Sequence, residues 1–592
     1  MASPTVTLFL TLLTLLTTYH YLIHPLLISP LRKIPPAHWT CPISPLWILH
    51  TRRSRNNNEN TTIHALHQRL GPLVRLGPNE ISVNSVDGGV RTIYGGGGGS
   101  GFEKGAWYAV FHNYGKPNIF SSLRRADHSA RKRVLSNVYA RSAIQASAAL
   151  HGIARDILCG RMLPRLVVGT GSRKAGGVNG EGVVVVVVVE AYAELFSGVA
   201  MDLITGYCFG LGQASNFTQD PGRCRAWVQD YKARQAYMFW PQEMPRLTAF
   251  LGAVGLKRWL LVPRWVDVAN EKIAAWVLGL CDAAEAVYCD REKVVEARDR
   301  ATVYNQLRGV INKSKGRDPD SSSSSSSYSS SPLGADERLE IASELLDQVL
   351  AGFDTTGITM TYLAWQLSKP ENRGIQRALR EELRANGATY RMATTADDDN
   401  EDDDGKDKAT AQGSCPDFKT LDGLPLLHAV VMESLRLHAA IPGCQPRITP
   451  QGASLGPPGE AWSVQGLPAN VRVNSYAYTL HLNADVFPQP ERWDPYRWLG
   501  GDGEVERGGG GEKARWFWAF GSGGRMCIGS HLAMIDMKSI VAAIWGNFET
   551  GIVDDAGMIP KGGYTCEPLG SPEGNYLLLS FEPVEEEEGV AS

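Results

Sequence analysis

The residues best suited to chemistry lie near the C-terminus, where one cysteine sits inside a glycine-rich loop. Residues 520–529 read Phe-Gly-Ser-Gly-Gly-Arg-Met-Cys-Ile-Gly, and a helical pattern begins directly afterwards at Ser530. The first N–H groups of that helix and the positive end of its dipole would stabilise Cys527 as a thiolate. A thiolate is a ligand for haem iron, where it favours cleavage of an O–O bond. The pattern therefore predicts oxygen activation, and neither a zinc site nor a disulfide accounts for all of it.

The other residues of this loop suit a flat cofactor. Gly521, Gly523 and Gly529 let the backbone approach a ring closely and tolerate turns barred to other residues. Arg525 lies two residues before the cysteine, where it could pair with a haem propionate. The alternative is a buried structural cysteine. Chance alone would produce the five fixed positions about once in ten thousand chains of this length, which disfavours that alternative. These positions are Phe520, Gly523, Arg525, Cys527 and Gly529.

A second polar group lies in the middle of a long apolar helix. Apolar residues recur with helical spacing from about Asp336 to Leu367, and Pro370 ends the pattern. The centre, residues 351–356, reads Ala-Gly-Phe-Asp-Thr-Thr, which is poor helix because glycine destabilises it and threonine bends it. A local violation of this kind is expected at a functional site. The alternative is an interior helix whose polar residues satisfy one another.

A third pattern places an acid and a base on one helix face. Glu433 and Arg436 have i,i+3 spacing on an otherwise apolar helix, so both charges would be buried and must be paired. Glu381 and Arg384 share the spacing, but they lie in a highly charged segment, which favours a solvated face.

Together these segments resemble the cytochrome P-450 family, and the resemblance covers about residues 30–585. It implies a mainly α fold with a small β portion. It also implies haem b (iron protoporphyrin IX) with Cys527 as the axial ligand of the iron. In that family the groove at the long helix holds dioxygen, the alcohol at the Thr355 position supports its activation, and the acid at the Asp354 position helps to relay protons. Phe520, Gly521, Arg525 and Gly529 are then cofactor-binding residues.

The resemblance further predicts a structural triad that holds the scaffold behind Cys527. In the family an arginine from a meander, here residues 487–498, joins the Glu433–Arg436 pair. The spacing of aromatic, proline and arginine residues favours Arg497 over Arg492 for this contact.

Two basic residues are the candidates for further contacts with the haem propionates. Arg447 follows a Pro-Gly-Cys-Gln-Pro segment that the family usually runs past the haem edge. The family's Trp-x-x-x-Arg pattern is altered here, since His128 and Lys132 stand at its two fixed positions. Lys132 or a neighbouring arginine is the expected partner. A solvated or partner-docking face is an equally weighted alternative for this run of charges.

The N-terminus predicts a membrane anchor. Residues 6–28 are rich in leucine and threonine, carry no Asp, Glu, Lys or Arg, and are close to the ~20 residues that span a bilayer. A cleaved signal peptide is disfavoured because positive charge and a cleavage site are missing. Arg32 and Lys33 follow, which favours a cytosolic location for the rest of the chain. We expect a single-pass protein of the endoplasmic reticulum membrane, with the prolines of 30–45 as a stiff hinge.

The expected domains are an anchor at 1–30 and one catalytic domain at 31–592. Low-complexity insertions are expected as surface excursions at about 169–189, 313–334, 393–416 and 500–513. The seven valines at 183–189 are too short to span a membrane and favour a buried strand or helix. The formal net charge of -3 gives no reason to expect a nucleic-acid partner.

The predicted function is that of a haem-thiolate monooxygenase that takes electrons from NADPH through a flavoprotein reductase, possibly with cytochrome b5 as a second donor. The expected substrate is an apolar small molecule, because aromatic residues are frequent in the segments that set specificity in the family. Several sequence segments resemble those of fungal family members that act in secondary metabolism. The alternative is a haem-binding sensor or an inactive family member.

Overall fold

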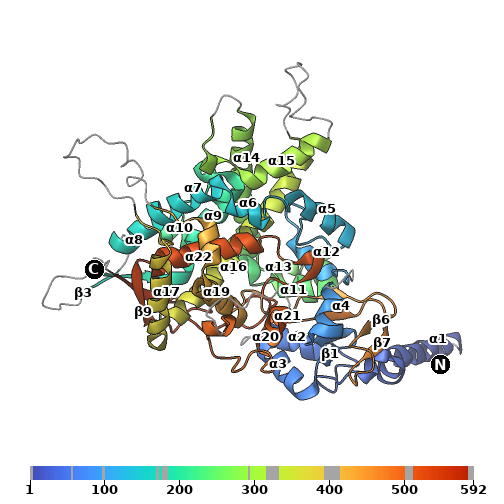
Figure 1. The fold of residues 1–592 in the computed structure, drawn as a ribbon. Coiled ribbons are helices and arrows are strands. Elements are labelled where there is room, and N and C mark those ends of the chain that lie inside the picture. The colour runs from blue at the N-terminus through green and yellow to red at the C-terminus, as the bar shows by residue number, and fades with distance from the viewer. Residues whose placement is uncertain are drawn as a thin grey trace, which may run out of the picture.

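The computed structural model describes residues 4–54, 58–95, 101–168, 173–176, 185–290, 294–314, 333–392, 414–500 and 511–584. These residues are mainly helical with a small β portion, which confirms the predicted fold class (Figure 1). The first eleven α-helices are α1 (Pro4–Thr18), α2 (Leu46–Arg53), α3 (Glu59–Leu70), α4 (Arg91–Tyr94), α5 (Arg125–Leu135), α6 (Arg141–Gln145), α7 (Ala148–Ile157), α8 (Leu163–Val168), α9 (Ser197–Phe209), α10 (Pro221–Gln235) and α11 (Phe239–Glu243). The others are α12 (Pro245–Ala253), α13 (Lys257–Leu260), α14 (Arg264–Cys289), α15 (Thr302–Ser314), α16 (Ala335–Leu367), α17 (Arg373–Ala385), α18 (Phe418–Gly423), α19 (Pro425–Leu437), α20 (Ala477–His481), α21 (Glu512–Trp516) and α22 (Ser530–Trp545).

The long helix predicted around Asp354 is α16, whose 33 residues cross the centre of the body. Its main neighbour is α9, which is buried along its whole length. A Cβ at Gly352 would lie 2.6 Å from Ile204 of α9, so this glycine permits the close approach of the two helices. The helix α22, which follows Cys527, also packs against α16 (Figure 1). The helix predicted to carry the acid and the alcohol and the helix that follows Cys527 are therefore neighbours.

Strands form two four-stranded sheets and one pair among the described residues. The first sheet has the order β1-β2-β8-β5, with β2 and β8 parallel and the other neighbours antiparallel. The second has the antiparallel order β3-β4-β10-β9, and β6 pairs with β7. Their bounds are β1 (Leu73–Gly77), β2 (Glu80–Val83), β3 (Arg173–Gly176), β4 (Val185–Glu190), β5 (Arg447–Ile448), β6 (Ala453–Leu455), β7 (Val464–Leu467), β8 (Arg472–Asn474), β9 (Phe548–Asp554) and β10 (Leu578–Pro583).

The described part of the valine run, from Val185, lies in strand β4, which is one of the two predicted alternatives, and it is not a surface excursion. In β4, Val187 and Val189 are buried, and Val187–Glu190 pair with β10. The run therefore belongs to a sheet of the body, because it buries alternate side chains. The insertions predicted at about 313–334, 393–416 and 500–513 lie mostly outside the described residues.

The N-terminal segment protrudes from the body as α1, continued by a π-helical stretch η1 (Tyr19–Ile28) (Figure 1). Residues Thr5–Ile28 are long and apolar enough to cross a membrane. The proline-rich segment that follows, which was predicted to be a stiff hinge, packs against the body. Leu31, Ile34 and Cys41 are buried, and buried Arg75 of β1 donates to the carbonyl oxygens of Pro25 and Pro42. The segment is thus packed on the first sheet.

Candidate functional site

The cysteine loop is shaped by two glycines in the left-handed region. Gly521 and Gly523 both have φ of +67°, which glycine adopts without strain. A Cβ on Gly523 would fall 2.0 Å from the carbonyl oxygen of Gly95, so no side chain fits there. Gly529 has no such constraint, because its φ is -83° and a Cβ would meet no described protein atom within 4 Å. Contact with a cofactor ring would account for glycine at this position.

Cys527 combines accessible surface with the electrostatic properties of a buried group. Its backbone N–H donates to the Phe520 carbonyl oxygen over 3.0 Å, which closes the loop. Its side chain has accessible surface, and yet burial raises the pKa of the thiol above its usual value. Both observations fit a side chain that opens onto an internal space. The Gly529 backbone N–H and the Lys132 ammonium act in the opposite direction on this pKa, and both favour the thiolate.

Lys132 contacts the cysteine loop directly. Its Nζ donates to the carbonyl oxygens of Met526 (2.8 Å) and Gly524 (3.2 Å). The ammonium is thus committed to the backbone next to Cys527, whereas the sequence predicted a haem propionate as its partner. His128, at the other altered position, is buried, and burial together with Arg525 lowers its pKa to about 3.

The Glu433 cluster forms as the spacing predicts. Arg436 donates to both oxygens of Glu433 over 2.8 and 2.7 Å, and neither side chain is exposed. Arg497 reaches Glu433 Oε1 over 3.0 Å, whereas the Arg492 guanidinium contacts Gln489. Trp498 Nε1 also donates to Glu433. The carboxylate of Glu433 is therefore the centre of a buried network that ties α19 to the meander.

The other acid–base pair with i,i+3 spacing, Glu381 and Arg384, is only partly solvated. Glu381 is exposed, as predicted. Arg384 is not, because its guanidinium donates to the carbonyl oxygens of Gly546 and Val584. The prediction of a solvated face is wrong for the arginine, which joins α17 to the C-terminal strands.

The acid and the alcohol of α16 have different partners. Asp354 is buried and accepts a hydrogen bond of 2.9 Å from the Tyr231 hydroxyl of α10. Burial and the nearby Glu567 raise the pKa of Asp354 to about 7. Thr355 donates over 2.8 Å to the carbonyl oxygen of Ala351, one turn earlier. Ala351 has exposed surface in the middle of this otherwise buried helix, so α16 opens onto a cavity at this point.

This cavity, of about 450 Å³, is the candidate substrate site. Its walls combine Ala351, Asp354 and Thr355 of α16 with aromatic side chains from several elements. The aromatic lining residues are Trp107, Phe111, Phe120, Tyr231, Phe239 and Tyr564. Asp347 also lines it, and burial raises the pKa of that carboxyl to about 8. The cavity thus combines aromatic walls with polar groups on α16 and with charged side chains from other elements, such as Arg234 and Lys561.

The rim of the cavity carries an ion network that sequence reasoning missed. Glu243, at the end of α11, accepts from Arg52 over 2.9 Å, from Arg472 over 2.7 Å and from Trp107 Nε1 over 2.9 Å. The two arginines lower the pKa of Glu243 to about 2. Because Arg52 lies on α2 and Arg472 on β8, Glu243 fastens α11 to the first sheet. The three charged residues are far apart in the sequence, and no local spacing signals their contact.

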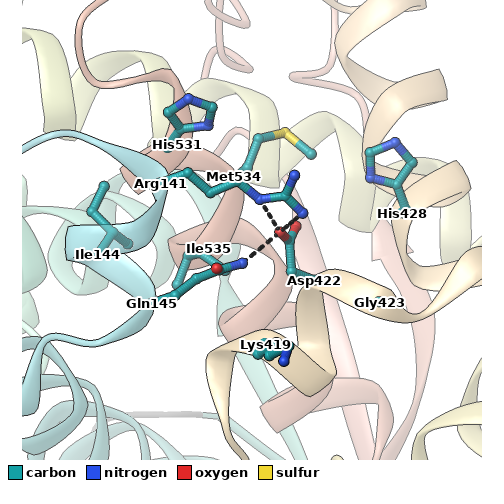
Figure 2. Close-up of a pocket in the computed structure, with 10 residues that line it drawn as sticks. All are labelled: Arg141, Ile144, Gln145, Lys419, Asp422, Gly423, His428, His531, Met534 and Ile535. Carbon is teal, nitrogen blue, oxygen red and sulfur yellow. Dashed lines mark hydrogen bonds and ion pairs between the residues drawn. The ribbon is translucent and has the colours of Figure 1, made fainter. Parts of the chain in front are cut away.

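A second cavity, of about 620 Å³, lies between α6, α18, α19 and α22 (Figure 2). Arg141 Nε and Gln145 both donate to Asp422, over 2.8 and 2.9 Å. Figure 2 shows His428 and His531 on opposite sides of it. None of the predicted site residues lines this cavity, although it is the larger one.

The residues around the first cavity and the cysteine loop fit haem. Arg447 is buried, donates to the Tyr108 hydroxyl over 3.0 Å, and its Nε has no hydrogen-bond partner among the described residues. Arg525 donates to the carbonyl oxygens of Ser122 and Leu123, and its nearest acid is the half-exposed Glu103. Arg447 and Arg525 both lower the pKa of nearby Lys104 and of nearby His128. An anionic group close to these cations would therefore be stabilised. Haem propionates are such groups.

Comparison with known proteins places the chain in one family. Residues 334–563 match the family described as cytochrome P-450. A cytochrome P-450 monooxygenase, avaI of Aspergillus versicolor, is 25% identical over 79% of this chain and 92% of its own length. Another, stcB of Emericella nidulans, is 25% identical over 87% of this chain and 81% of its own length. An inactive cytochrome P-450 monooxygenase, cloA of Claviceps fusiformis, is 35% identical over only 22% of this chain and 24% of its own length. Residues 334–563 hold the cysteine loop, the acid–alcohol pair and the Glu433 network, and this region belongs to the cytochrome P-450 family, while the relatives that match most of the chain are fungal cytochrome P-450 monooxygenases.

Proposed function

We propose that this chain is a membrane-anchored monooxygenase that uses haem b and NADPH-derived electrons to insert one oxygen atom of dioxygen into an apolar small molecule. The overall reaction consumes substrate, dioxygen, NADPH and one proton, and it yields hydroxylated or epoxidised product, water and NADP⁺. The observation that carries the proposal is the packing of α22, which begins three residues after Cys527, against α16, whose Ala351 and Thr355 line the cavity.

Cys527 would bind the haem iron, while Phe520, Gly521, Gly529 and Arg447 would surround the ring and Arg525 would lie at its edge. A thiolate-bound haem supplies the activation of dioxygen. The loop itself contributes geometry: the left-handed Gly521 and Gly523 fix the turn, and the Glu433 network holds the scaffold that presents it.

Asp354 is suited to holding and moving a proton near neutral pH. A pKa of about 7 means that both protonation states of the carboxyl are populated there. The hydrogen bond from Tyr231 fixes the orientation of the carboxyl. Thr355, one residue further on, presents its hydroxyl at the cavity wall. These two residues are the proposed catalytic pair.

The cavity favours an apolar substrate. Aromatic walls contribute burial of apolar area and shape, while the polar groups on α16 orient the ligand. Because two relatives of similar length are fungal monooxygenases, we propose an intermediate of fungal secondary metabolism as the substrate class.

Electrons would come from NADPH–cytochrome P-450 reductase, with cytochrome b5 as an additional donor. Arg125 and Arg133 of α5 and Arg124 directly before it are exposed, and Lys132 of the same helix contacts the cysteine loop. A cationic face beside the loop suits an acidic flavoprotein domain.

The proposed location is the endoplasmic reticulum membrane, with the catalytic body in the cytosol. The apolar helix Thr5–Ile28 supports an anchor, and Arg32 and Lys33 after it support this orientation. A second apolar surface lies on α12, α13 and the start of α14, where Phe250, Trp259 and Trp265 are exposed. Contact of this surface with the bilayer would remove it from water.

The proposed function is tested in microsomes that contain the full chain and a fungal reductase. Candidate secondary metabolites are supplied with NADPH under ¹⁸O-labelled dioxygen, and products are analysed by mass spectrometry. The expected product gains one ¹⁸O atom and requires NADPH. The contrary result is a haem-loaded protein that binds carbon monoxide, and whose spectrum shifts with some ligands, but that consumes no NADPH with any of them. This result would support a sensor or an inactive family member.

A further inference from the structure

Lys104 is a buried cation that the sequence analysis did not single out. It lies in the segment between α4 and η4 (Ala106–Phe111), and only 8% of its surface is exposed. Its Nζ donates to the Phe120 carbonyl oxygen and lies over the rings of Tyr108 (4.1 Å) and Phe120 (4.3 Å). An ammonium has three donors, and here one meets a carbonyl while ring faces flank the group.

Lys104 shares its surroundings with two further cations. The Arg447 guanidinium lies 5.7 Å from the centre of the same Tyr108 ring. Arg525 binds the carbonyl oxygens of Ser122 and Leu123, in the segment whose Phe120 carbonyl binds Lys104. Three cations are thus gathered around residues 108 and 120–123.

No carboxylate among the described residues forms an ion pair with Lys104 or Arg447, and Arg525 meets only Glu103. Burial, Arg447 and Arg525 lower the pKa of Lys104. Asp347 is the carboxyl that acts to raise the pKa of Lys104. The pKa of Asp347 is itself raised to about 8, so this carboxyl is largely protonated at neutral pH. Buried cations are normally paired, so this cluster lacks an anion.

We propose that Lys104 binds a haem propionate together with Arg447. Lys104 would thus have the role that the sequence analysis expected of Lys132. The proposal rests on the proposed haem binding. It is specific to this chain because Lys132 is held by the Gly524 and Met526 carbonyls on the cysteine loop. A propionate would provide the missing anion and accept from the unused donors of Lys104 Nζ and from Arg447 Nε.

The test compares haem with haem dimethyl ester, in which both propionates are esterified and uncharged. The full chain is prepared without haem and titrated with each form, and the dissociation constants are measured from the Soret band and tryptophan fluorescence. The wild-type chain should bind haem at least tenfold more tightly than the ester, as expected for loss of a charge-assisted contact. Lys104→Met should weaken haem binding about tenfold and reduce the preference for haem over the ester.

Lys132→Met is the matched control and should retain the full preference for haem over the ester. Lys104→Arg should retain most of it and shows that the site tolerates substitution. If Lys104→Met cannot be prepared without haem, the rate of haem transfer from the purified holoprotein to excess apomyoglobin replaces the titration and should rise about tenfold. An undiminished preference in Lys104→Met, or its loss in Lys132→Met, would overturn the proposal. Failure of the wild-type chain to bind either porphyrin would instead refute the proposed haem binding itself.

Discussion

The hydroxyl of Tyr231 donates a hydrogen bond of 2.9 Å to Asp354 Oδ2, although the two residues are 123 positions apart in the sequence. Both side chains are buried. This contact joins α10, which covers the cavity, to the acid that is proposed to move protons on α16. The hydrogen bond also favours the ionised carboxylate and so lowers the pKa of Asp354 against the effect of burial.

Replacing Tyr231 should therefore shift the titration of Asp354. Tyr231→Phe removes the stabilising hydrogen bond, so the pKa of Asp354 should rise from about 7 by up to about one unit. The carboxyl would then remain protonated to higher pH. Infrared difference spectra over pH 5–9 would follow its C=O band, with Asp354→Asn identifying that band. NADPH oxidation should become less coupled to product, with several-fold more hydrogen peroxide released.

Tyr237→Phe is the control, since Tyr237 packs on Trp265 of α14. It should leave both the band and the coupling unchanged. An identical titration of the band in Tyr231→Phe and in the wild-type protein would show that the hydrogen bond does not tune Asp354.

The Glu433 network should be strongly sensitive to neutralisation. Glu433→Gln leaves the buried guanidinium of Arg436 without its carboxylate, which should lower the free energy of unfolding by about 3–5 kcal/mol. Urea unfolding and the haem content of the purified protein measure the effect. Arg492→Ala, which removes an exposed guanidinium, should change stability by less than about 0.5 kcal/mol. Equal effects of the two substitutions would argue against a special role for Glu433.

The Glu243 contacts should control entry to the cavity. Glu243→Gln removes the charge that fastens α11 to Arg52 and Arg472, so ligands should enter and leave several-fold faster. Stopped-flow spectroscopy with an azole ligand gives both rates, and Glu271→Gln on the exposed side of α14 is the control. Because the pKa of Glu243 is about 2, its carboxylate stays ionised between pH 5 and 9. Titration of Glu243 should therefore cause no change in the wild-type rates over this pH range. Unaltered rates in Glu243→Gln would refute control by this contact.

Asp536 should make the protein less stable at alkaline pH. This carboxyl of α22 is buried, and burial raises its pKa to about 8. The folded state therefore binds a proton that the unfolded state releases above about pH 4, and stability falls as pH rises from about 4 to about 8. Asp347 and Asp354 titrate in the same range, so the difference between wild type and Asp536→Asn isolates the contribution of Asp536.

Asp536→Asn should match the wild type in acid and exceed it in base. We expect equal stability near pH 4 and a gain of up to about 5 kcal/mol at pH 9. Chemical denaturation at the two pH values measures this difference. A variant that is no more stable than the wild type at pH 9 would show that Asp536 is ionised in the folded protein at little cost.

The features that could be predicted from the sequence are those set by local spacing. The helix α16 follows from apolar periodicity and the stop at Pro370, and the pairing of Glu433 with Arg436 follows from i,i+3 spacing on an apolar helix. In the same way, left-handed φ angles at Gly521 and Gly523 follow from glycine in a tight loop.

The contacts that sequence reasoning missed depend on distant parts of the chain. Glu243 meets Arg472 across 229 positions, and Lys132 meets Met526 across 394. Gly352 was recognised only as a residue that destabilises the helix, whereas its role in the close approach of α9 is revealed by the packing of the two helices. Arg384 looked solvated because its neighbours in the sequence are charged, yet its partners are carbonyl groups from the C-terminal region.

The central claim, that Cys527 is the thiolate ligand of a haem iron, is tested most directly by the carbon monoxide difference spectrum of the reduced, detergent-solubilised protein beside Cys527→Ser. The account predicts a strongly red-shifted, thiolate-type Soret band in the wild-type protein that is lost in the variant. A wild-type protein that is folded and loaded with haem but lacks this band, or a variant that retains it, would contradict the account.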